Sequence, residues 1–319
     1  WTLDIADDDA TTASSVEALA PGAGPQWTAL VDHAEDIGSV AERTFLAGAG
    51  ASPWSLVARS RRPLDLRRVD GARSLAKAAA AQFDDDRLRQ LVGRYATYSG
   101  SSPYAAPATL ACIAHVERAF GCWHVAGGLA TLADALGRTA GSVGVDLRLG
   151  VDVGRVTTAG GSVSGVELAD GGHIAADVVV SDVDAAHLYS DLLPAPKRGR
   201  SVERAGRSMS AFLMCAAVRG RTEGVAHHNV FFSLHDEQEF TYLSDGRMAI
   251  DPTVYACVSS VTDPSMAPSD AENWVIQVNT PPATGIDRKL MSAAVLNRLA
   301  ERGVDLRPVS YTHLRAHET

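Results

Sequence analysis

The sequence lacks closely spaced cysteines and long apolar segments. Its four cysteines, Cys112, Cys122, Cys215 and Cys257, show no C-x-x-C spacing. They therefore favour free thiols in a reducing compartment over a disulfide framework or a zinc site. No apolar run approaches the roughly 18 residues that a membrane-spanning helix needs, and no signal peptide is visible. We expect a cytoplasmic protein, or one that lies on a membrane without crossing it.

Positive charge is also scarce. The chain has 29 lysines and arginines against 38 aspartates and glutamates, a formal charge of −9. This balance argues against a nucleic-acid surface, because phosphate binding needs basic residues. With 46% hydrophobic and 21% charged residues the chain is globular, and 319 residues suffice for two domains.

The common catalytic motifs are incomplete. Gly48 and Gly50 begin a G-x-G-x-x-G pattern, but Pro53 takes the third position and no buried strand precedes it. We interpret this stretch as a loop and expect the complete dinucleotide loop upstream of Trp1. Ser142 lies in an A-x-S-x-G pattern, yet a helix precedes it and a strand follows, the reverse of a hydrolase nucleophile elbow.

Two polar clusters have the residue types of a functional site. Asp84 to Asp86, with nearby arginines, is interpreted as helix capping and surface ion pairs. A second group has metal-ligand chemistry but no recognised ligand spacing, so we assign it a structural or loop role and predict no metal site. Its members are His227, His228, His235, Asp236, Glu237 and Glu239.

The most informative stretch runs from Leu129 to Asp182. Apolar residues recur at helical spacing over Leu129–Ala140, and then at period two through Val151, Val153 and Val156. Gly-Gly and Asp-Gly pairs mark two hairpin turns, which predicts a β-meander. Val178–Val180 indicates a strand buried on both faces, ending at Ser181-Asp182. Helix, meander and buried strand together predict half of a nucleotide-binding α/β domain.

The remaining segments predict a mixed domain of α+β type. Trp1–Ala6 is a weak strand candidate. Helices are expected at Ser14–Leu19, Gln26–Phe45, Ser74–Gln82, Asp85–Arg94, Ala106–Ala119, Lys197–Arg207 and Met291–Arg302. Strands are expected at Ser210–Val218, Val230–Ser233, Thr253–Val261 and Trp274–Val278.

The order of motifs in the central stretch resembles the bacterial phytoene desaturase family. The motifs are W-x-x-x-GG-x-x-x-L-x-x-AL, GV-x-x-R, V-x-x-V, GV-x-L-x-DG and AD-VVVS, and the likeness extends over roughly Asp65 to Arg307. Members of this family are FAD-dependent carotenoid desaturases related to amine oxidases. The resemblance implies a partial Rossmann-like FAD domain of the glutathione-reductase type, with an inserted mixed substrate domain. It also implies that the N-terminal dinucleotide loop and the C-terminal FAD segment lie outside this chain.

The resemblance divides the chain into four parts. Residues 1–125 and 191–308 correspond to the substrate domain, and 126–190 to the second half of the FAD domain. Residues 309–319 (VSYTHLRAHET) differ in composition from the rest, and their first residues can be encoded by a sequencing adapter. We interpret this tail as adapter-derived and leave it out of the fold prediction.

The resemblance also assigns site residues. Gly127, Gly128, Val153, Ser181 and Asp182 are expected to bind FAD, with the Val153 backbone at the adenine and Val156 as its companion. The substrate is expected to contact three aromatic residues, Tyr98, Tyr104 and Trp123. No catalytic residue is assigned, because a hydride removed from a hydrocarbon is accepted by an organic cofactor rather than by a side chain.

The function implied is desaturation of a carotenoid precursor such as phytoene, by a protein peripheral on the inner face of the cell membrane. Two alternatives stay open: another amine-oxidase-like flavoprotein, and a flavin-free lipid- or polyene-binding protein. If part of the FAD domain is absent, Val178–Val180 and the Leu129–Leu136 face lack their neighbours. We then expect these apolar residues to be exposed and the chain to aggregate.

Overall fold

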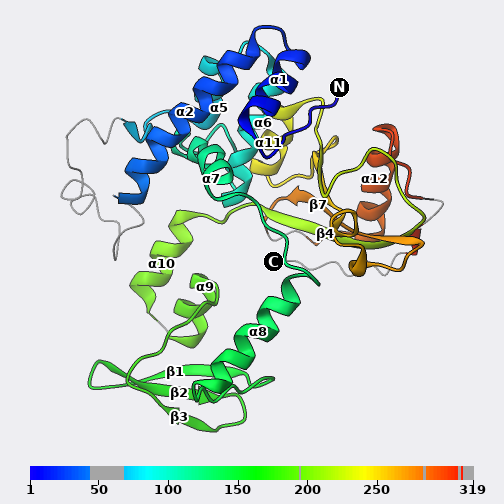
Figure 1. The fold of residues 1–319 in the computed structure, drawn as a ribbon. Coiled ribbons are helices and arrows are strands. Elements are labelled where there is room, and N and C mark those ends of the chain that lie inside the picture. The colour runs from blue at the N-terminus through cyan, green and yellow to red at the C-terminus, as the bar shows by residue number, and fades with distance from the viewer. Residues whose placement is uncertain (44–67, 194, 283–284, 308–309, 312–319) are drawn as a thin grey trace. The chain divides into compact units, whose positions relative to one another are not determined.

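A computed structural model describes residues 1–43, 68–193, 195–282, 285–307 and 310–311 (Figure 1). The chain forms two compact units. Unit 1 consists of Trp1–His124 and Ser208–Thr319, and unit 2 of Val125–Arg207. Unit 2 contains the 126–190 segment that the sequence indicates as half of a nucleotide-binding domain, and it extends to Arg207.

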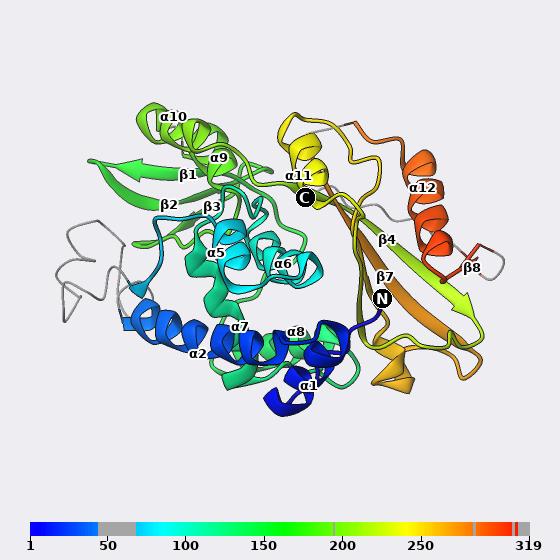
Figure 2. The ribbon, with the colours of Figure 1, turned by 90° about the horizontal axis from the view of Figure 1, so that it is seen from above.

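One part of unit 1 is helical, drawn in blue and cyan in Figure 2. Three of its α-helices begin where Asp8, Ser74 and Asp85 accept hydrogen bonds from backbone amides of the first turn. Trp27, Leu75, Phe83 and other buried apolar side chains form their common core. The helices are α1 (Asp9–Leu19), α2 (Ala23–Ala41), α5 (Leu75–Gln82), α6 (Asp86–Gly93) and α7 (Cys112–Phe120), with 3₁₀ turns η2 (Arg94–Ser99) and η3 (Ala108–Ala111).

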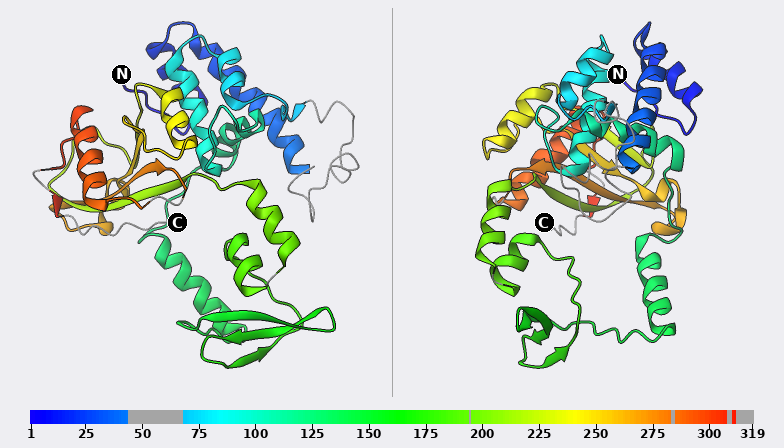
Figure 3. Two further views of the ribbon diagram at one scale, coloured as in Figure 1. Left: turned by 180° about the vertical axis from the view of Figure 1, so that it is seen from behind. Right: turned by 90° about the vertical axis from the view of Figure 1, so that its left-hand side faces the viewer.

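The other part of unit 1 is a five-stranded antiparallel sheet with the order β5-β6-β7-β4-β8. Alternate side chains of β4, β6 and β7 pack with Val295 and Leu299 of helix α12, which covers one face (Figure 3). The strands are β4 (Ser210–Arg219), β5 (His228–Phe231), β6 (Val254–Cys257), β7 (Ala271–Thr280) and β8 (Ser310–Tyr311). The helical elements are α11 (Asp236–Ser244), η5 (Ser259–Val261), η6 (Pro264–Met266) and α12 (Arg288–Glu301).

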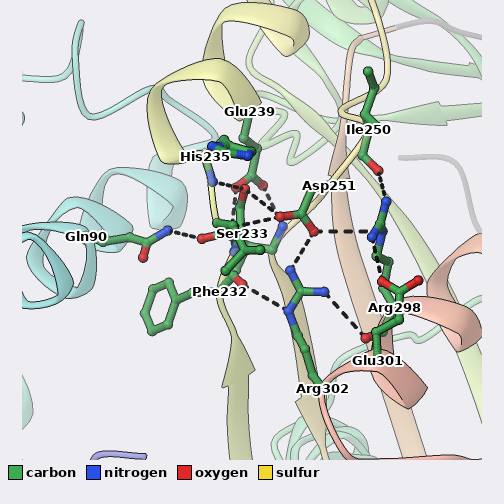
Figure 4. A network of polar contacts seen from close by, with 12 residues as sticks. Gln90, Phe232, Ser233, His235, Glu239, Ile250, Asp251, Arg298, Glu301 and Arg302 are labelled. Atoms are coloured by element: carbon green, nitrogen blue, oxygen red, sulfur yellow. Dashed lines mark hydrogen bonds and ion pairs between the residues drawn. The ribbon is translucent and has the colours of Figure 1, made fainter. Parts of the chain in front are cut away.

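A polar network within unit 1 is centred on Asp251 (Figure 4). The Asp251 carboxylate accepts hydrogen bonds from Arg302 Nη2 at 2.5 Å and from the Leu234 amide at 2.7 Å. Arg302 also donates to the Phe232 carbonyl, so α12 is joined to the segment that follows β5. Burial alone would raise the pKa of Asp251, but the bonds from Arg302 and the Leu234 amide outweigh it and lower this pKa below its ordinary value.

A second carboxylate beside this network is fully buried. Glu239 of α11 accepts hydrogen bonds from the Thr253 amide at 3.1 Å and the Thr253 hydroxyl at 2.7 Å. The buried Arg94 guanidinium lies 3.9 Å away and offsets the charge. Gln90 of α6 donates to the Ser233 carbonyl at 2.9 Å. These contacts connect the helical part of unit 1 to its sheet. A buried charge is tolerated when it is paired and hydrogen-bonded, as the Glu239 carboxylate is.

Unit 2 contains a three-stranded antiparallel meander and four helical segments. The predicted hairpin turns are confirmed, because Gly160 and Gly161 connect β1 to β2 with positive φ angles of 60° and 84°. The buried Val156 faces the inside of the unit. The strands are β1 (Val153–Ala159), β2 (Ser162–Leu168) and β3 (His173–Ala175). The helical segments are α8 (Leu129–Ser142), α9 (Ala185–His187), the π-helical turn η4 (Leu188–Leu192) and α10 (Pro196–Ala205).

Two strand predictions are wrong. Val178–Val180 forms no strand, and Val178 and Val180 are 76% and 93% exposed. A β-branched run becomes a strand only where another strand pairs with it, and no described strand does so here. Trp1–Ala6 is also unpaired; its end is held by the Thr12 hydroxyl, which bonds to both backbone groups of Ala6.

The helix predictions are confirmed with shifted ends, but the α8 face is not covered. Leu129 is 74% exposed, and Leu132 and Leu136 are exposed as well. This agrees with the expectation that the face lacks neighbours. The predicted strand over Thr253–Val261 ends at Cys257 and continues as the 3₁₀ turn η5. The glycine pattern at Leu46–Pro53 lies outside the described residues.

Within the described part of the chain, no helix combines the length and the apolarity that a membrane crossing requires.

The Asp251 network predicts a pH-dependent stability. Asp251→Asn should lower the free energy of unfolding at pH 7 by about 1.5–3 kcal/mol, the range for hydrogen bonds to charged groups. Because the folded-state pKa is below that of an unfolded aspartate, about 3.9, this contribution is present above that value. It is lost as the pH falls through the folded-state pKa. Urea unfolding followed by the fluorescence of the buried Trp274 measures it.

Asp245→Asn is the matched control, because Asp245 pairs with Arg247 at 3.0 Å on the surface. Asp245→Asn should lower the free energy of unfolding by less than about 1 kcal/mol at every pH. Equal losses in the two variants, or an Asp251→Asn loss that is as large near pH 3 as at pH 7, would contradict the assignment.

Candidate functional site

The glycine pair expected at the cofactor begins helix α8. Gly127 and Gly128 have φ angles of 75° and 85°, a region that favours glycine. A Cβ added to Gly127 would lie 3.0 Å from Thr131 Cγ2, and the Thr131 hydroxyl bonds to the Gly128 carbonyl at 2.8 Å. A side chain at Gly127 would therefore crowd Thr131 and strain the backbone. The glycine pair stands at the N-terminus of a 14-residue helix, where anionic groups are stabilised.

The backbone of Val153 points away from the meander. The Ala169 amide donates to the Asp152 carbonyl, and the Leu168 amide donates to the Gly172 carbonyl. Val153 and Leu168 are thus a non-hydrogen-bonded antiparallel pair. In such a pair, N–H and C=O are directed outward from the partner strand. Since β1 is an edge strand of the described meander and Val153 is 41% exposed, its N–H is placed to bind a group other than β2.

Ser181 and Asp182 follow the extended segment that forms no strand. Both are exposed, and the Val183 amide donates to the Ser181 hydroxyl at 3.4 Å. The structure thus places the five residues expected at the cofactor on three segments of unit 2: the α8 start, the β1 edge and the 181–182 loop.

The three aromatic residues expected to contact the substrate all lie in unit 1, but each donates a hydrogen bond to a different residue. The Tyr98 hydroxyl donates to Glu117 at 3.0 Å, and the Tyr104 hydroxyl donates to Asp236 at 3.0 Å. Trp123 donates only to the nearby Phe120 carbonyl and is 87% exposed. No hydrogen bond or ring contact among the described residues joins the three to one another.

Glu117 is a candidate acid–base residue that the sequence did not reveal. It accepts hydrogen bonds from Tyr98 and, at 3.3 Å, from the buried Tyr95 hydroxyl. Burial raises the pKa of Glu117, and the two tyrosines offset part of this effect. A carboxyl group held in this way can take up or release one proton. Its only signal in the sequence is an acidic residue within the otherwise apolar face of α7.

A histidine cluster on the sheet was assigned a structural role from its spacing. The rings of His227 and His228 lie 4.4 Å apart between centroids, and the His124 ring lies 5.1 Å from that of His227. Burial and the neighbouring histidines lower the pKa of His227 and of His228, which favours the neutral form of both rings.

Strand pairing brings a cysteine to this cluster. His228 of β5 lies directly opposite Cys257 of β6, and directly opposite residues project from the same face. Tyr255, two residues before Cys257, shares this face, and its hydroxyl lies 2.8 Å from His228 Nδ1. Burial raises the pKa of Tyr255 to about 12 and also raises the pKa of the Cys257 thiol. His228 and Cys257 are 29 positions apart in the sequence, which hides this proximity.

Comparison with known proteins gives a family match over most of the chain. Residues 30–299 match the model of the flavin containing amine oxidoreductases. The 4,4'-diapolycopene oxygenase of a Methylomonas species is 28% identical over 99% of this chain and 64% of its own length. The hydroxyneurosporene desaturase of Cereibacter sphaeroides is 39% identical over 71% of this chain and 46% of its own length. The chain thus spans about half to two thirds of the length of these curated relatives.

Solved structures show the same fold. A redesigned putrescine oxidase is similar with a TM-score of 0.53, at 15% identity, over 93% of this chain and 62% of its own. At this identity the likeness shows the fold alone. The mixed α/β architecture expected from the sequence is confirmed at this level.

The two tyrosine–carboxylate pairs predict separable pKa changes. Tyr98→Phe removes a hydrogen bond that favours charged Glu117, so the pKa of Glu117 should rise while that of Asp236 is unchanged. Tyr104→Phe should raise the pKa of Asp236 and leave Glu117 unchanged. Side-chain carboxyl resonances followed by NMR during a pH titration measure both. If the two variants shift both carboxyls alike, the pairs do not act independently.

Proposed function

The chain belongs to the flavin-containing amine oxidoreductases, in the group of the carotenoid desaturases and oxygenases, and we propose that it is part of an FAD-dependent desaturase of a carotenoid precursor. The family also includes amine oxidases, so the family match alone does not select a substrate. The proposal rests on the likeness to relatives with carotenoid names, which match up to 99% of the chain. A phytoene-like polyene is the finer substrate assignment.

The residues of unit 2 fit a flavin dinucleotide. Gly127 and Gly128, which have no side chains, would let the cofactor approach the N-terminus of α8 closely. The outward N–H of Val153 would donate to the adenine edge, with Val156 holding β1 in the core. Ser181 and Asp182 offer hydroxyl and carboxylate acceptors for hydroxyl groups of the cofactor. Bound FAD supplies the acceptor for a hydride, a role that no side chain of the chain can fill.

In unit 1, aromatic surface and a proton acceptor support the substrate part of the proposal. Tyr98, Tyr104 and Trp123 present exposed rings that an isoprenoid chain would contact. Removing two hydrogens from adjacent carbons as a hydride and a proton leaves the proton to be taken up. Glu117, in its charged form, would accept this proton while Tyr98 and Tyr95 hold the carboxylate. Since the substrate partitions into lipid, we also propose that the protein acts at a membrane surface, on the cytoplasmic side.

The proposed function is tested with the natural reading frame that encodes this chain, expressed in full. The protein is incubated anaerobically with FAD and with lipid vesicles that contain phytoene. The expected result is a product with a longer conjugated polyene, seen as absorbance at longer wavelength, with reduction of the flavin. Flavin reduction by a primary amine and none by phytoene would instead favour an amine oxidase. Tight phytoene binding without bound flavin would favour a polyene-binding protein.

Val153 gives a sharper test of the cofactor site. Val153→Pro removes the outward N–H, while Val153→Ile keeps it; because this N–H points away from β2, proline deletes no bond of the meander. We expect Val153→Pro to weaken FAD binding roughly tenfold, the equivalent of one hydrogen bond, and Val153→Ile to change it little. Flavin fluorescence titration measures both affinities, and amide hydrogen exchange of β1 and β2 verifies the fold. Equal affinities in the two variants would remove Val153 from the site.

A further inference from the structure

We propose that His227, His228 and Cys257 of unit 1 form a binding site for a Zn²⁺ ion. One ring nitrogen of each histidine and the Cys257 sulfur lie within 4.8 Å of one another. This site is distinct from the flavin chemistry of the proposed function and uses none of its residues.

The distances suit a tetrahedral ion after a small adjustment. Zn–N bonds of about 2.0–2.1 Å and Zn–S bonds of about 2.3 Å place ligand atoms roughly 3.3–3.6 Å apart. From separations of up to 4.8 Å, the three donor atoms therefore need to approach one another by at most about 1.2–1.5 Å. His228 is exposed and its ring can rotate, whereas Cys257 is held by β6 between β5 and β7. The rigid thiol thus provides a fixed point, and the two rings close on the ion.

The Nδ1 atoms of both histidines already have hydroxyl groups as partners. His227 Nδ1 lies 2.8 Å from the Thr262 hydroxyl, and His228 Nδ1 lies 2.8 Å from the Tyr255 hydroxyl. With each Nδ1–H donating to its hydroxyl, the two Nε2 atoms are assigned in this proposal as the ligands of the ion. Partners of this kind orient most metal-binding histidines in proteins and fix their tautomer.

The donor set selects the metal class. Two imidazole nitrogens and a thiolate suit Zn²⁺, and carboxylate-preferring ions such as Mg²⁺ and Ca²⁺ are disfavoured. Binding replaces the Cys257 S–H bond by a Zn–S bond and releases one proton to solvent. Three protein ligands leave a fourth position. The His124 ring lies 5.1 Å from that of His227 between centroids, and its Nε2 lies 3.4 Å from an Asp263 carboxylate oxygen.

The sheet itself provides a matched control. His228, Cys257, Val275 and Cys215 are opposite one another in one row across β5, β6, β7 and β4. Neighbouring strands are about 4.8 Å apart, so Cys215 lies roughly 10 Å from Cys257 on the same face and cannot share its ion. Both cysteines are free thiols. Cys215→Ser therefore removes an equivalent thiol without touching the site.

The test uses the whole chain under anaerobic, reducing conditions and adds Zn²⁺ alone, or Co²⁺ as a spectroscopic substitute. We expect saturable binding of one ion per chain and a thiolate-to-Co²⁺ charge-transfer band. Cys257→Ser should abolish the band and weaken Zn²⁺ at least about 100-fold, and Cys215→Ser should leave both unchanged. Thr262→Val removes an outer partner and should weaken Zn²⁺ about 10- to 100-fold. Circular dichroism of each variant verifies folding.

Three results would overturn the proposal. The unaltered chain could bind no stoichiometric Zn²⁺. Cys257→Ser could keep its affinity, which would mean that scattered surface histidines bind the ion. Cys215→Ser could lose the charge-transfer band, which would place the thiolate elsewhere. Since none of these measurements involves flavin or polyene, failure of this proposal and failure of the proposed function are distinguishable.

Discussion

The antiparallel pairing of β4 with β7 is the constraint on which unit 1 depends. Ten consecutive residue pairs, from Ser210 with Thr280 to Arg219 with Ala271, set the register of the whole sheet. Because side chains alternate between faces, this register directs one set toward α12 and the other set away from it. A shift of β4 by one residue relative to β7 would exchange the two faces of β4, so that Cys215 would turn toward the core and Met214 away from it. The apolar core and the histidine–cysteine row are thus two results of one register.

Buried charge is the second feature that holds unit 1 together. Glu239 and Arg94 come from segments far apart in sequence, and each is buried where an unpaired charge would be costly. Hydrogen bonds from Thr253 complete the shell of Glu239, and Asp251 plays the same part for Arg302 of α12. Such networks contribute little net free energy compared with an apolar replacement. They do make wrong arrangements costly, because any other packing would leave a charge unpaired.

Unit 2 has a different character. Its three meander strands pair in sequence order, yet its helix α8 buries no residue, and Val178 and Val180 after β3 are exposed. Each burial of a Val or Leu side chain contributes roughly 1.5–3 kcal/mol, so these side chains represent stabilisation that the unit does not obtain from the residues described. Unit 2 also carries the glycine turn at Gly127 and Gly128 and, at the edge of β1, the outward backbone N–H of Val153.

The sequence by itself determined the local structure and the family. Helical and strand periodicity placed the helices of unit 1 and the meander within a few residues, since these elements depend on side chains near one another in the chain. The glycine pair, the V-x-x-V motif and the Asp-Gly turn identified the family, because their order persists without any contact between them.

Tertiary structure alone decided the rest. Val178–Val180 has the composition of a strand but lacks a partner, and no local pattern reports whether a partner exists. Glu117 meets Tyr95 and Tyr98 only because α7 packs beside η2. His228 meets Cys257 only because β5 pairs with β6 in one particular register, and register is set by burial across the whole sheet.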